Sequence, residues 1–375
     1  MDKIILISND FPPKVSGVAD YLALLAEELS KSFSLVLLTS QTLVTLPAYL
    51  NNLVSVKRWD LFALFKILKI IQRESPQVVL LQYTTNMYGW TNFCLLFLMV
   101  ILKIRKQKII LVGHELLLPG YPNWFGRMIK RHVNNFKDLM MVKASSGVIV
   151  TFGKRFEKLK EYKSVITQIP VGSNILPRVI SQNELRAIKM EFNPKDELVI
   201  GYFGIPHEDK NYSLLLDVAR TLEGVKFLIV GPEDRTLKRL VENSRIGGKI
   251  QFTGYLPAPI LGSIFRIIDL YLNVDRRGIS SRKCSLITVM AHKIPILSSI
   301  DSDFYDDIFI PGYHFYKVDL NPKQISDSIS SFRLSKMKLL EIAENAYRLY
   351  LDFFTWPIIA NKYKEFIEEV CLKKN

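Results

Sequence analysis

Small hydroxyl residues and basic residues occur together in one segment at the start of a predicted helix. Ser280, Ser281, Arg282 and Ser285 lie in this segment. Hydroxyl and backbone N–H groups at the start of a helix favour an anion, and an arginine can make a forked contact with phosphate oxygens. Lys210, in the loop after an earlier strand, can meet the same anion from another side. The pattern predicts a diphosphate site, and solvated basic residues beside a capped helix remain the alternative.

Two turns between a predicted strand and a predicted helix are also rich in small residues. The first contains Ser16 and Gly17, and the second contains Gly204. A glycine lets the backbone approach a ligand closely, and the free N–H groups of the following helix favour an anion. Each turn is equally compatible with an ordinary structural role. Neither GxGxxG nor a GxxxxGKS or GxxxxGKT motif occurs, which disfavours nicotinamide and P-loop chemistry.

A histidine and a glutamate follow the predicted strand at Ile109–Gly113. The carboxyl ends of parallel strands form the ligand edge of an open sheet, and His114 and Glu115 stand at such an end. His114 is therefore a candidate site residue, although the sequence supports a structural histidine equally well.

Apolar strand-like runs alternate with helical stretches in both halves of the chain, which predicts parallel sheets covered by helices on both faces. Three prolines, Pro170, Pro177 and Pro194, interrupt the alternation and indicate a crossing between domains. The predicted fold class is α/β, with two Rossmann-like, doubly wound domains that face each other across a cleft. We expect an N-terminal domain at 1–178, a C-terminal domain at 179–353 and a final helix within 354–375 that returns to the first domain.

The order of several short motifs resembles that of the family 4 retaining glycosyltransferases, which have the GT-B fold. No single motif is specific, but together they extend over nearly the whole chain. The motifs are Pro12-Pro13 followed by Ser16-Gly17-Val18, Gly204 to Lys210 leading into Leu214-Leu215-Leu216, Ile229-Val230-Gly231-Pro232-Glu233, Phe252-Thr253-Gly254-Tyr255-Leu256, and Asp269. The resemblance implies a hexosyltransferase-type enzyme that moves a sugar from a nucleotide-sugar donor to an acceptor and retains the anomeric configuration.

The resemblance also implies a role for each candidate residue. His114, Lys210 and Arg282 would be the catalytic residues, with His114 near the reacting carbon of the transferred sugar. The residues expected to bind the donor are Gly17, Gly204, Lys210, Tyr255, Leu256, Ser280, Ser281, Arg282, Ser285 and Thr288. The residues expected on the acceptor side are Ser16, Glu115, Ser173 and Asn174.

The sequence departs from the family at two positions that usually hold glutamates. Ser280 and Thr288 stand there, whereas the family uses the two carboxylates to hold the sugar and ribose hydroxyls of the donor. A branch that lacks the paired glutamates has a GxSxRxxS pattern instead. That pattern is matched by Gly278, Ser280, Arg282 and Ser285. The way in which the donor is held is therefore expected to differ from the family's usual one.

A second departure concerns the leaving group. The family usually carries an arginine just after the glycine of the second turn, and Ile205 stands there in this sequence. Lys210 and Arg282 would then share the neutralisation of the leaving nucleoside diphosphate. The alternative function is that of a non-catalytic GT-B subunit, which binds a nucleotide-sugar or serves as a scaffold.

Metal ions and cofactors are not required by this interpretation. Asp301-Ser302-Asp303 has the form of a metal-binding DxD motif, but it lies among other acids and is interpreted as a polar loop. The three cysteines form no CxxC pair. We expect reduced thiols and a cytoplasmic protein, because the apolar run at the amino terminus is too short for a signal peptide.

Positive charge is concentrated in the first half of the chain. Residues 1–178 carry 23 lysines and arginines against 11 acids, whereas residues 179–375 carry 27 against 25. Basic clusters occur at Lys103–Lys108, at Arg127 with Lys130 and Arg131, and at Lys154–Lys163. These clusters suit an anionic membrane surface, ordinary solvated helix faces or nucleic acid.

The acceptor is expected to be a glycan or a lipid-linked molecule of bacterial cell-surface polysaccharide synthesis. No helix-turn-helix, zinc or RNA-recognition signature occurs, so nucleic acid is the least favoured partner. The apolar stretch between Phe93 and Leu102 is too short to span a bilayer and is expected to form a buried or surface-docked helix.

Overall fold

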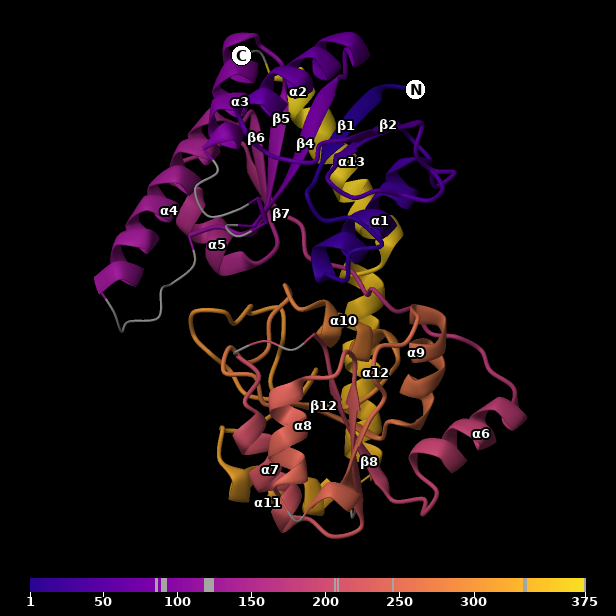
Figure 1. The fold of residues 1–375 in the computed structure, drawn as a ribbon. Coiled ribbons are helices and arrows are strands. Elements are labelled where there is room, and N and C mark those ends of the chain that lie inside the picture. Colours follow the sequence, from indigo (N-terminus) through magenta and orange to yellow (C-terminus); the bar gives the residue numbers. More distant parts are fainter. Residues whose placement is uncertain are drawn as a thin grey trace. The chain divides into compact units, whose positions relative to one another are not determined.

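The computed structural model describes residues 1–84, 87–88, 93–117, 125–205, 207, 209–244, 246–332 and 336–373, without the side chains of 125–131 and 336. The chain forms two compact units (Figure 1). Unit 1 comprises Met1–Pro170 and Trp356–Asn375, and unit 2 comprises Val171–Thr355. The chain thus enters unit 2 eight residues before the boundary expected at 178.

In the described part of unit 1, seven parallel strands form a sheet in the order β3-β2-β1-β4-β5-β6-β7. The strands are β1 (Lys3–Ile7), β2 (Ser34–Thr39), β3 (Asn52–Ser55), β4 (Val78–Thr84), β5 (Ile109–Glu115), β6 (Gly147–Val150) and β7 (Ile166–Gln168). The central strands are apolar and buried on both faces, as a parallel sheet between two helix layers requires. The strand order reverses between β1 and β4, and ligands bind outside the carboxyl ends at such a reversal.

The helices of unit 1 cover both faces of this sheet. They are α1 (Gly17–Leu29), α2 (Leu61–Glu74), α3 (Cys94–Ile104), α4 (Phe125–Ala144), α5 (Gly153–Leu159) and α13 (Trp356–Leu372). Right-handed crossovers place α1 on one face and α2 to α5 on the other, because the two halves of the sheet are traversed in opposite directions. Accordingly, Ile67 of α2, Leu98 of α3 and Met141 of α4 share a buried cluster with Val79 of β4.

Helix α13 follows unit 2 in the sequence but packs against α1 (Figure 1). The hydroxyl groups of Tyr21 in α1 and Tyr363 in α13 are hydrogen-bonded at 2.8 Å, and both side chains are buried. Phe366 and Val370 of α13 lie directly over Gly147 in β6, where a Cβ would come within 2.7 Å of Val370. The last helix is therefore an integral part of unit 1.

In the described part of unit 2, six parallel strands form a sheet in the order β10-β9-β8-β11-β12-β13. The strands are β8 (Leu198–Phe203), β9 (Val225–Val230), β10 (Ile250–Phe252), β11 (Leu270–Asn273), β12 (Ile296–Ser298) and β13 (Tyr316–Lys317). The order reverses between β8 and β11, as it does between β1 and β4 in unit 1. Two Rossmann-like units with parallel sheets confirm the predicted fold class.

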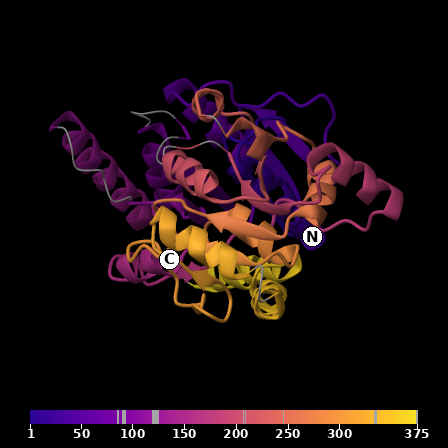
Figure 2. The same cartoon turned by 90° about the horizontal axis from the view of Figure 1, so that it is seen from below.

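The helices of unit 2 are α6 (Gln182–Phe192), α7 (Tyr212–Thr221), α8 (Arg235–Glu242), α9 (Ala258–Ile264), α10 (Cys284–Ala291), α11 (Pro322–Phe332) and α12 (Lys336–Phe353), with short 3-10 turns η1 (Gly247–Lys249) and η2 (Phe265–Ile267). In Figure 2, as in Figure 1, α6 lies at the margin of unit 2, where it packs against α9 and η2. Helix α10 begins within the serine-rich segment singled out by the sequence, between Arg282 and Ser285.

Candidate functional site

Three of the predicted donor residues lie together at the carboxyl edge of the sheet in unit 2. Gly204 directly follows β8 and has φ +136°, a conformation that residues with a Cβ rarely adopt. A Cβ at this position would lie 3.2 Å from Nζ of Lys210 and 3.9 Å from Cβ of Ser285. The glycine, the lysine and the first turn of α10 therefore surround one small region beside the strand reversal.

Two lysines share one buried carboxylate in this region. Nζ of Lys210 lies 3.2 Å from Oδ1 of Asp275, and Nζ of Lys283 lies 2.9 Å from its Oδ2. The side chains of Lys210, Asp275 and Lys283 are 8%, 7% and 14% exposed, respectively. The hydroxyl of Tyr202 also donates to Asp275. Two ammonium groups on one carboxylate leave this edge of the sheet with an excess of positive charge.

The burial of this cluster changes the pKa of its members. Burial raises the pKa of Asp275, but the attraction of Lys210 and Lys283 outweighs it, and the net pKa is lower than usual. Burial lowers the pKa of Lys283 to about 8, against the attraction of Asp275 and with the repulsion of Lys210 and Arg282. Asp275 is therefore ionised near neutral pH, whereas Lys283 loses its proton under mildly alkaline conditions.

Arg282 lies beside a second arginine on the same aromatic ring. The guanidinium carbons of Arg282 and Arg277 lie 4.9 and 5.0 Å from the ring centroid of Phe304. Arg277 also forms an ion pair with Asp209 at 2.8 Å. Cation–π contacts of this kind help to hold a guanidinium in place.

Ser280 and Ser281 are engaged by a carboxylate of the chain itself. Both side chains are buried, and their hydroxyls lie 3.2 and 2.7 Å from Oδ2 of Asp306, which also accepts the backbone N–H of Ser281. Gly278 has φ +54°, and a Cβ there would lie 2.5 Å from the carbonyl oxygen of Ser299. The serine-rich segment is thus fixed by internal hydrogen bonds.

Thr288 and Ser173 contact each other, although the sequence assigned them to opposite sides of the reaction. Thr288 lies in α10 and is fully buried, and its Oγ1 is 3.1 Å from Oγ of Ser173. Ser173 lies in unit 2 and also donates to the carbonyl oxygen of Ile175. Oδ1 of the neighbouring Asn174 is buried and accepts no hydrogen bond from the described residues. The described contacts of Thr288 and Ser173 fasten the segment after Pro170 to α10.

Tyr255 and Leu256 follow β10, at the far side of the same edge. Tyr255 is 63% exposed and Leu256 is half-buried. Gly254, just before them, has φ +68° and forms a bridge with Gly231. Gly231 in turn has φ +128°, and a Cβ on it would lie 2.7 Å from the carbonyl oxygen of Gly204. Glycines thus bring the turns after β8, β9 and β10 close together.

In unit 1, the predicted residues occupy the corresponding edge of the first sheet. Ser16 caps α1, since its Oγ accepts the N–H of Ala19, and it donates to Oδ2 of Asp10 at 2.9 Å. Gly17 begins the helix, and a Cβ there would meet open space. These residues hold the turn after β1, at the strand reversal of unit 1.

His114 is the penultimate residue of β5 and lies next to the end of β4. Its Nε2 lies 2.8 Å from Oε1 of Gln82, and its ring packs edge-on against Tyr21. Burial lowers the pKa of His114 to about 4, so the imidazole is neutral at pH 7. Nε2 of Gln82 is buried, and none of the described residues accepts a hydrogen bond from it. Glu115, the next residue, is half-buried.

The sequence did not point to Asp275, Lys283 or Asp306. Asp275 follows β11 almost directly, which is the signal that could have found it, because this strand is the partner of β8 at the reversal. Lys283 directly precedes α10, but the predicted phosphate contact was assigned to the neighbouring Arg282. Asp306 lies 25 residues after Ser281 in the chain, in a loop without a recognisable pattern.

One comparison with known protein families matches a stretch of unit 2. Residues 184–349 match the family model described as glycosyl transferases group 1. This stretch of unit 2 is therefore similar to the group 1 glycosyltransferases. The match includes Lys210, Asp275 and Lys283 but ends before α13. No curated protein sequence matches the chain.

Solved structures resemble the whole chain. Sucrose-phosphate synthase from Thermosynechococcus elongatus matches with TM-score 0.77 and 15% identity over 99% of both chains. Anabaena HepE in complex with UDP-glucose matches with TM-score 0.74 and 13% identity over 98% of this chain and 100% of the other. WaaG, a glycosyltransferase involved in lipopolysaccharide biosynthesis, matches with TM-score 0.71 and 10% identity over 97% of this chain and 99% of the other. The chain thus has the GT-B fold.

Proposed function

We propose that the protein transfers a sugar from a nucleotide-sugar to a glycan or lipid-linked acceptor, with retention of anomeric configuration. The observation that carries the proposal is the cluster of Lys210 and Lys283 on the single carboxylate of Asp275, at the strand reversal of unit 2. A diphosphate would neutralise the excess charge of this cluster. The nucleotide-sugar present in the HepE structure supports this class of donor.

Such a transfer demands little covalent chemistry from the protein. The bond between sugar and diphosphate breaks as the acceptor attacks, and the departing diphosphate accumulates negative charge. Preorganised cations in a site of low polarity stabilise this charge. One well-placed donor lowers the activation free energy by about 3 kcal/mol. Lys210, Lys283 and Arg282 supply the cations, so the proposed mechanism is independent of metal.

We assign His114 to the sugar rather than to the diphosphate. Its imidazole is neutral at pH 7, which suits a hydrogen bond to a sugar hydroxyl and not the neutralisation of an anion. The acceptor is proposed to belong to cell-surface polysaccharide synthesis, and the enzyme to act in the cytoplasm at the inner face of the membrane. The description of WaaG as a lipopolysaccharide enzyme supports this class of acceptor.

Donor binding can be tested by thermal shift with UDP-, GDP-, ADP-, dTDP- and CMP-sugars. A ligand that binds the folded state raises the melting temperature. One nucleotide class is expected to shift the wild type, with the shift lost in Lys210→Ala and Arg282→Ala and retained in His114→Ala. Turnover is expected to fall in all three variants. Normal turnover in both Lys210→Ala and Arg282→Ala would remove the assignment of the site.

Donor affinity is expected to decrease as the pH rises from 7 to 9. Lys283 has a pKa of about 8, so its charge is present below this pH and is lost above it. A diphosphate favours the protonated form, and binding near pH 8 should take up a proton. Calorimetry in two buffers of different ionisation enthalpy measures this uptake. In Lys283→Met the uptake should disappear, and an unchanged uptake would show that another group titrates.

A non-catalytic GT-B subunit is the second candidate. It is favoured by Ser280 and Thr288, which stand where the family usually has glutamates and are buried in contacts with Asp306 and Ser173. This alternative predicts a thermal shift with the nucleotide-sugar but no release of nucleoside diphosphate with any acceptor. Release that depends on the acceptor and is lost in Lys210→Ala would exclude it.

A further inference from the structure

The outer faces of α2, α3 and α4 expose large apolar side chains to solvent. We call the outward side chains of these three helices the α2–α4 surface. The largest are Leu61, Phe62 and Phe65 of α2, Phe97 and Ile104 of α3, and Phe136 of α4. Helix α3 packs against both α2 and α4, so these residues belong to one continuous layer on one face of the sheet in unit 1.

These side chains do not contribute to the core of unit 1. Phe62 is 86% exposed, Ile104 is 75% exposed and Phe65 is 66% exposed. The opposite sides of the same helices are buried against the sheet through residues such as Ile67 and Leu98. Monomeric proteins seldom expose a contiguous apolar area of this kind unless it meets a partner.

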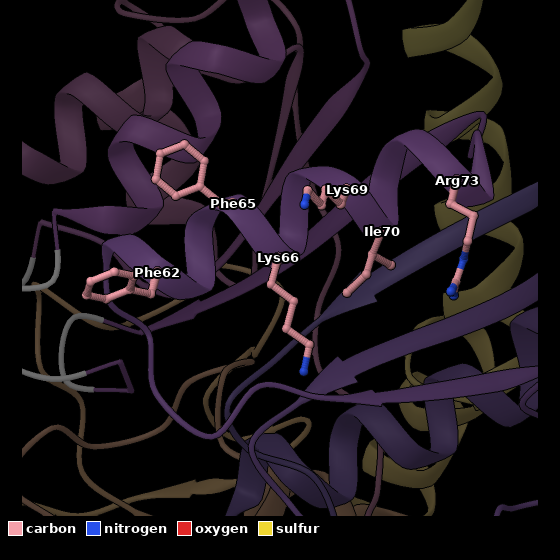
Figure 3. A pocket seen from close by; sticks show the side chains of 6 residues that line it. All are labelled: Phe62, Phe65, Lys66, Lys69, Ile70 and Arg73. Carbon is pink, nitrogen blue, oxygen red and sulfur yellow. The ribbon is translucent and has the colours of Figure 1, made fainter.

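Basic side chains accompany the apolar ones. On α2, Phe62, Phe65, Lys66, Lys69 and Arg73 surround an open hollow of about 430 Å³ together with Ile70. Figure 3 shows the two phenylalanines towards one end of the helix and Arg73 at the other, with the lysines between them. A lipid-facing helix combines these features, with aromatic residues that enter the acyl region and cations that meet anionic headgroups.

The acids of the described part of this layer are already engaged. Glu74 accepts from Lys3 and Arg73, Asp60 caps α2, and Asp138 is buried with the hydroxyl of Tyr83. The charge facing outward is therefore positive. The side chains of Arg127, Lys130 and Arg131, the basic cluster noted in the sequence, lie outside the described residues.

We propose that the α2–α4 surface docks on the interface of an anionic lipid bilayer. Exposed phenylalanines on adjacent helices favour a bilayer over nucleic acid, because a polynucleotide offers phosphate to the lysines but no hydrocarbon to the apolar side chains. No helix in the described part of the chain is long and apolar enough to cross a membrane. Docking would therefore be peripheral, with Phe62 and Phe65 inserted and Lys66 and Lys69 at the headgroups.

Vesicle co-sedimentation of the full chain tests this inference without any need for turnover. Binding to phosphatidylcholine vesicles should rise when about 30% phosphatidylglycerol is added and fall in about 0.5 M salt. Phe62→Ser with Phe65→Ser should weaken binding by at least about tenfold, since two interfacial aromatic residues are lost. Lys66→Gln with Lys69→Gln should weaken it roughly tenfold on anionic vesicles alone.

Matched controls are available on unit 2. Met190 is 76% exposed on α6 and Leu340 is 60% exposed on α12, so Met190→Ser with Leu340→Ser removes a comparable apolar area elsewhere. Arg186 and Lys195 are exposed and serve as the control for charge. These variants should bind vesicles as the wild type does. Melting temperatures of all variants are measured, so that a loss of binding through unfolding is recognised.

A gain of signal gives an independent readout. Brominated lipid should quench the fluorescence of the tryptophan added in Phe62→Trp. The fluorescence of Met190→Trp should respond to this lipid as that of the wild type does. Vesicle binding that is unchanged by the phenylalanine pair would overturn the proposal. So would binding to a polynucleotide that needs the lysines but not the phenylalanines. Failure of docking would leave donor binding and turnover on a water-soluble acceptor untouched, which separates this inference from the proposed function.

Discussion

Replacement of Lys210 or Lys283 by alanine is expected to lower the rate of sugar transfer by at least about tenfold, and by up to about a thousandfold if the lost cation acts mainly in the transition state. Both ammonium groups contact the same carboxylate at the strand reversal of unit 2. Without one of them, the remaining lysine is largely neutralised by Asp275, and this cluster no longer has an excess of positive charge to offer the diphosphate.

The two lysines should also behave as one functional unit. Because they act on the same charge, the Lys210→Ala and Lys283→Ala double variant should lose less than the product of the single losses. Steady-state rates with the donor found by thermal shift measure this coupling. Lys195→Ala, at an exposed lysine of unit 2, is the matched control and should keep the wild-type rate. Independent, multiplicative losses would mean that the lysines do not share the diphosphate.

Asp275→Asn is expected to lower the free energy of unfolding by about 3–5 kcal/mol, because it leaves the ammonium groups of two buried lysines without their common counter-charge. Urea denaturation at pH 7 measures the loss. The packing of the side chain changes little in this substitution, so the effect reports the charge. Variants of exposed carboxylates, such as Asp196→Asn, should change stability by less than about 1 kcal/mol.

The pH dependence of this loss provides a second test. In the folded variant the pKa of Lys283 should fall further below that of an unfolded lysine, because burial disfavours its charge and no carboxylate opposes this effect. Below the pKa of the lysine in the folded variant, the buried charge destabilises the fold. As the pH rises above this pKa, the folded state loses the proton and the destabilisation is relieved. The deficit should therefore shrink between pH 7 and pH 9. If the loss of unfolding free energy did not depend on pH, it would be attributed to packing or to the lost hydrogen bond from Tyr202.

The two parallel sheets could be predicted because each central strand is an uninterrupted apolar run, which is required of a strand buried on both faces. Gly204 and Lys210 could be found for a related reason, since both follow such a strand at its carboxyl end. The contact between Lys210 and Asp275 joins positions 65 residues apart. No local pattern encodes this distance, and the order of the strands in the sheet decides it.

The serine-rich segment shows where sequence reasoning was incomplete. Its composition suggested hydroxyl groups free to bind an anion, but the side chains of Ser280 and Ser281 donate to Asp306. The contact of Thr288 with Ser173 spans 115 residues and joins two side chains that had been placed on different substrates. Residue type identified the chemistry of this segment, whereas its partners depend on loops whose path has no periodicity.

The return of α13 to unit 1 has a consequence for the order of folding during synthesis. Unit 2 is continuous in the sequence, but unit 1 is interrupted by it and is completed by the last helix. Until α13 has left the ribosome, Tyr21 lacks the hydroxyl of Tyr363, and Gly147 of β6 lacks its cover of Phe366 and Val370. Domains usually fold in the order in which they emerge. Here the half of the chain that is made first is the half that must wait longest for its core to close.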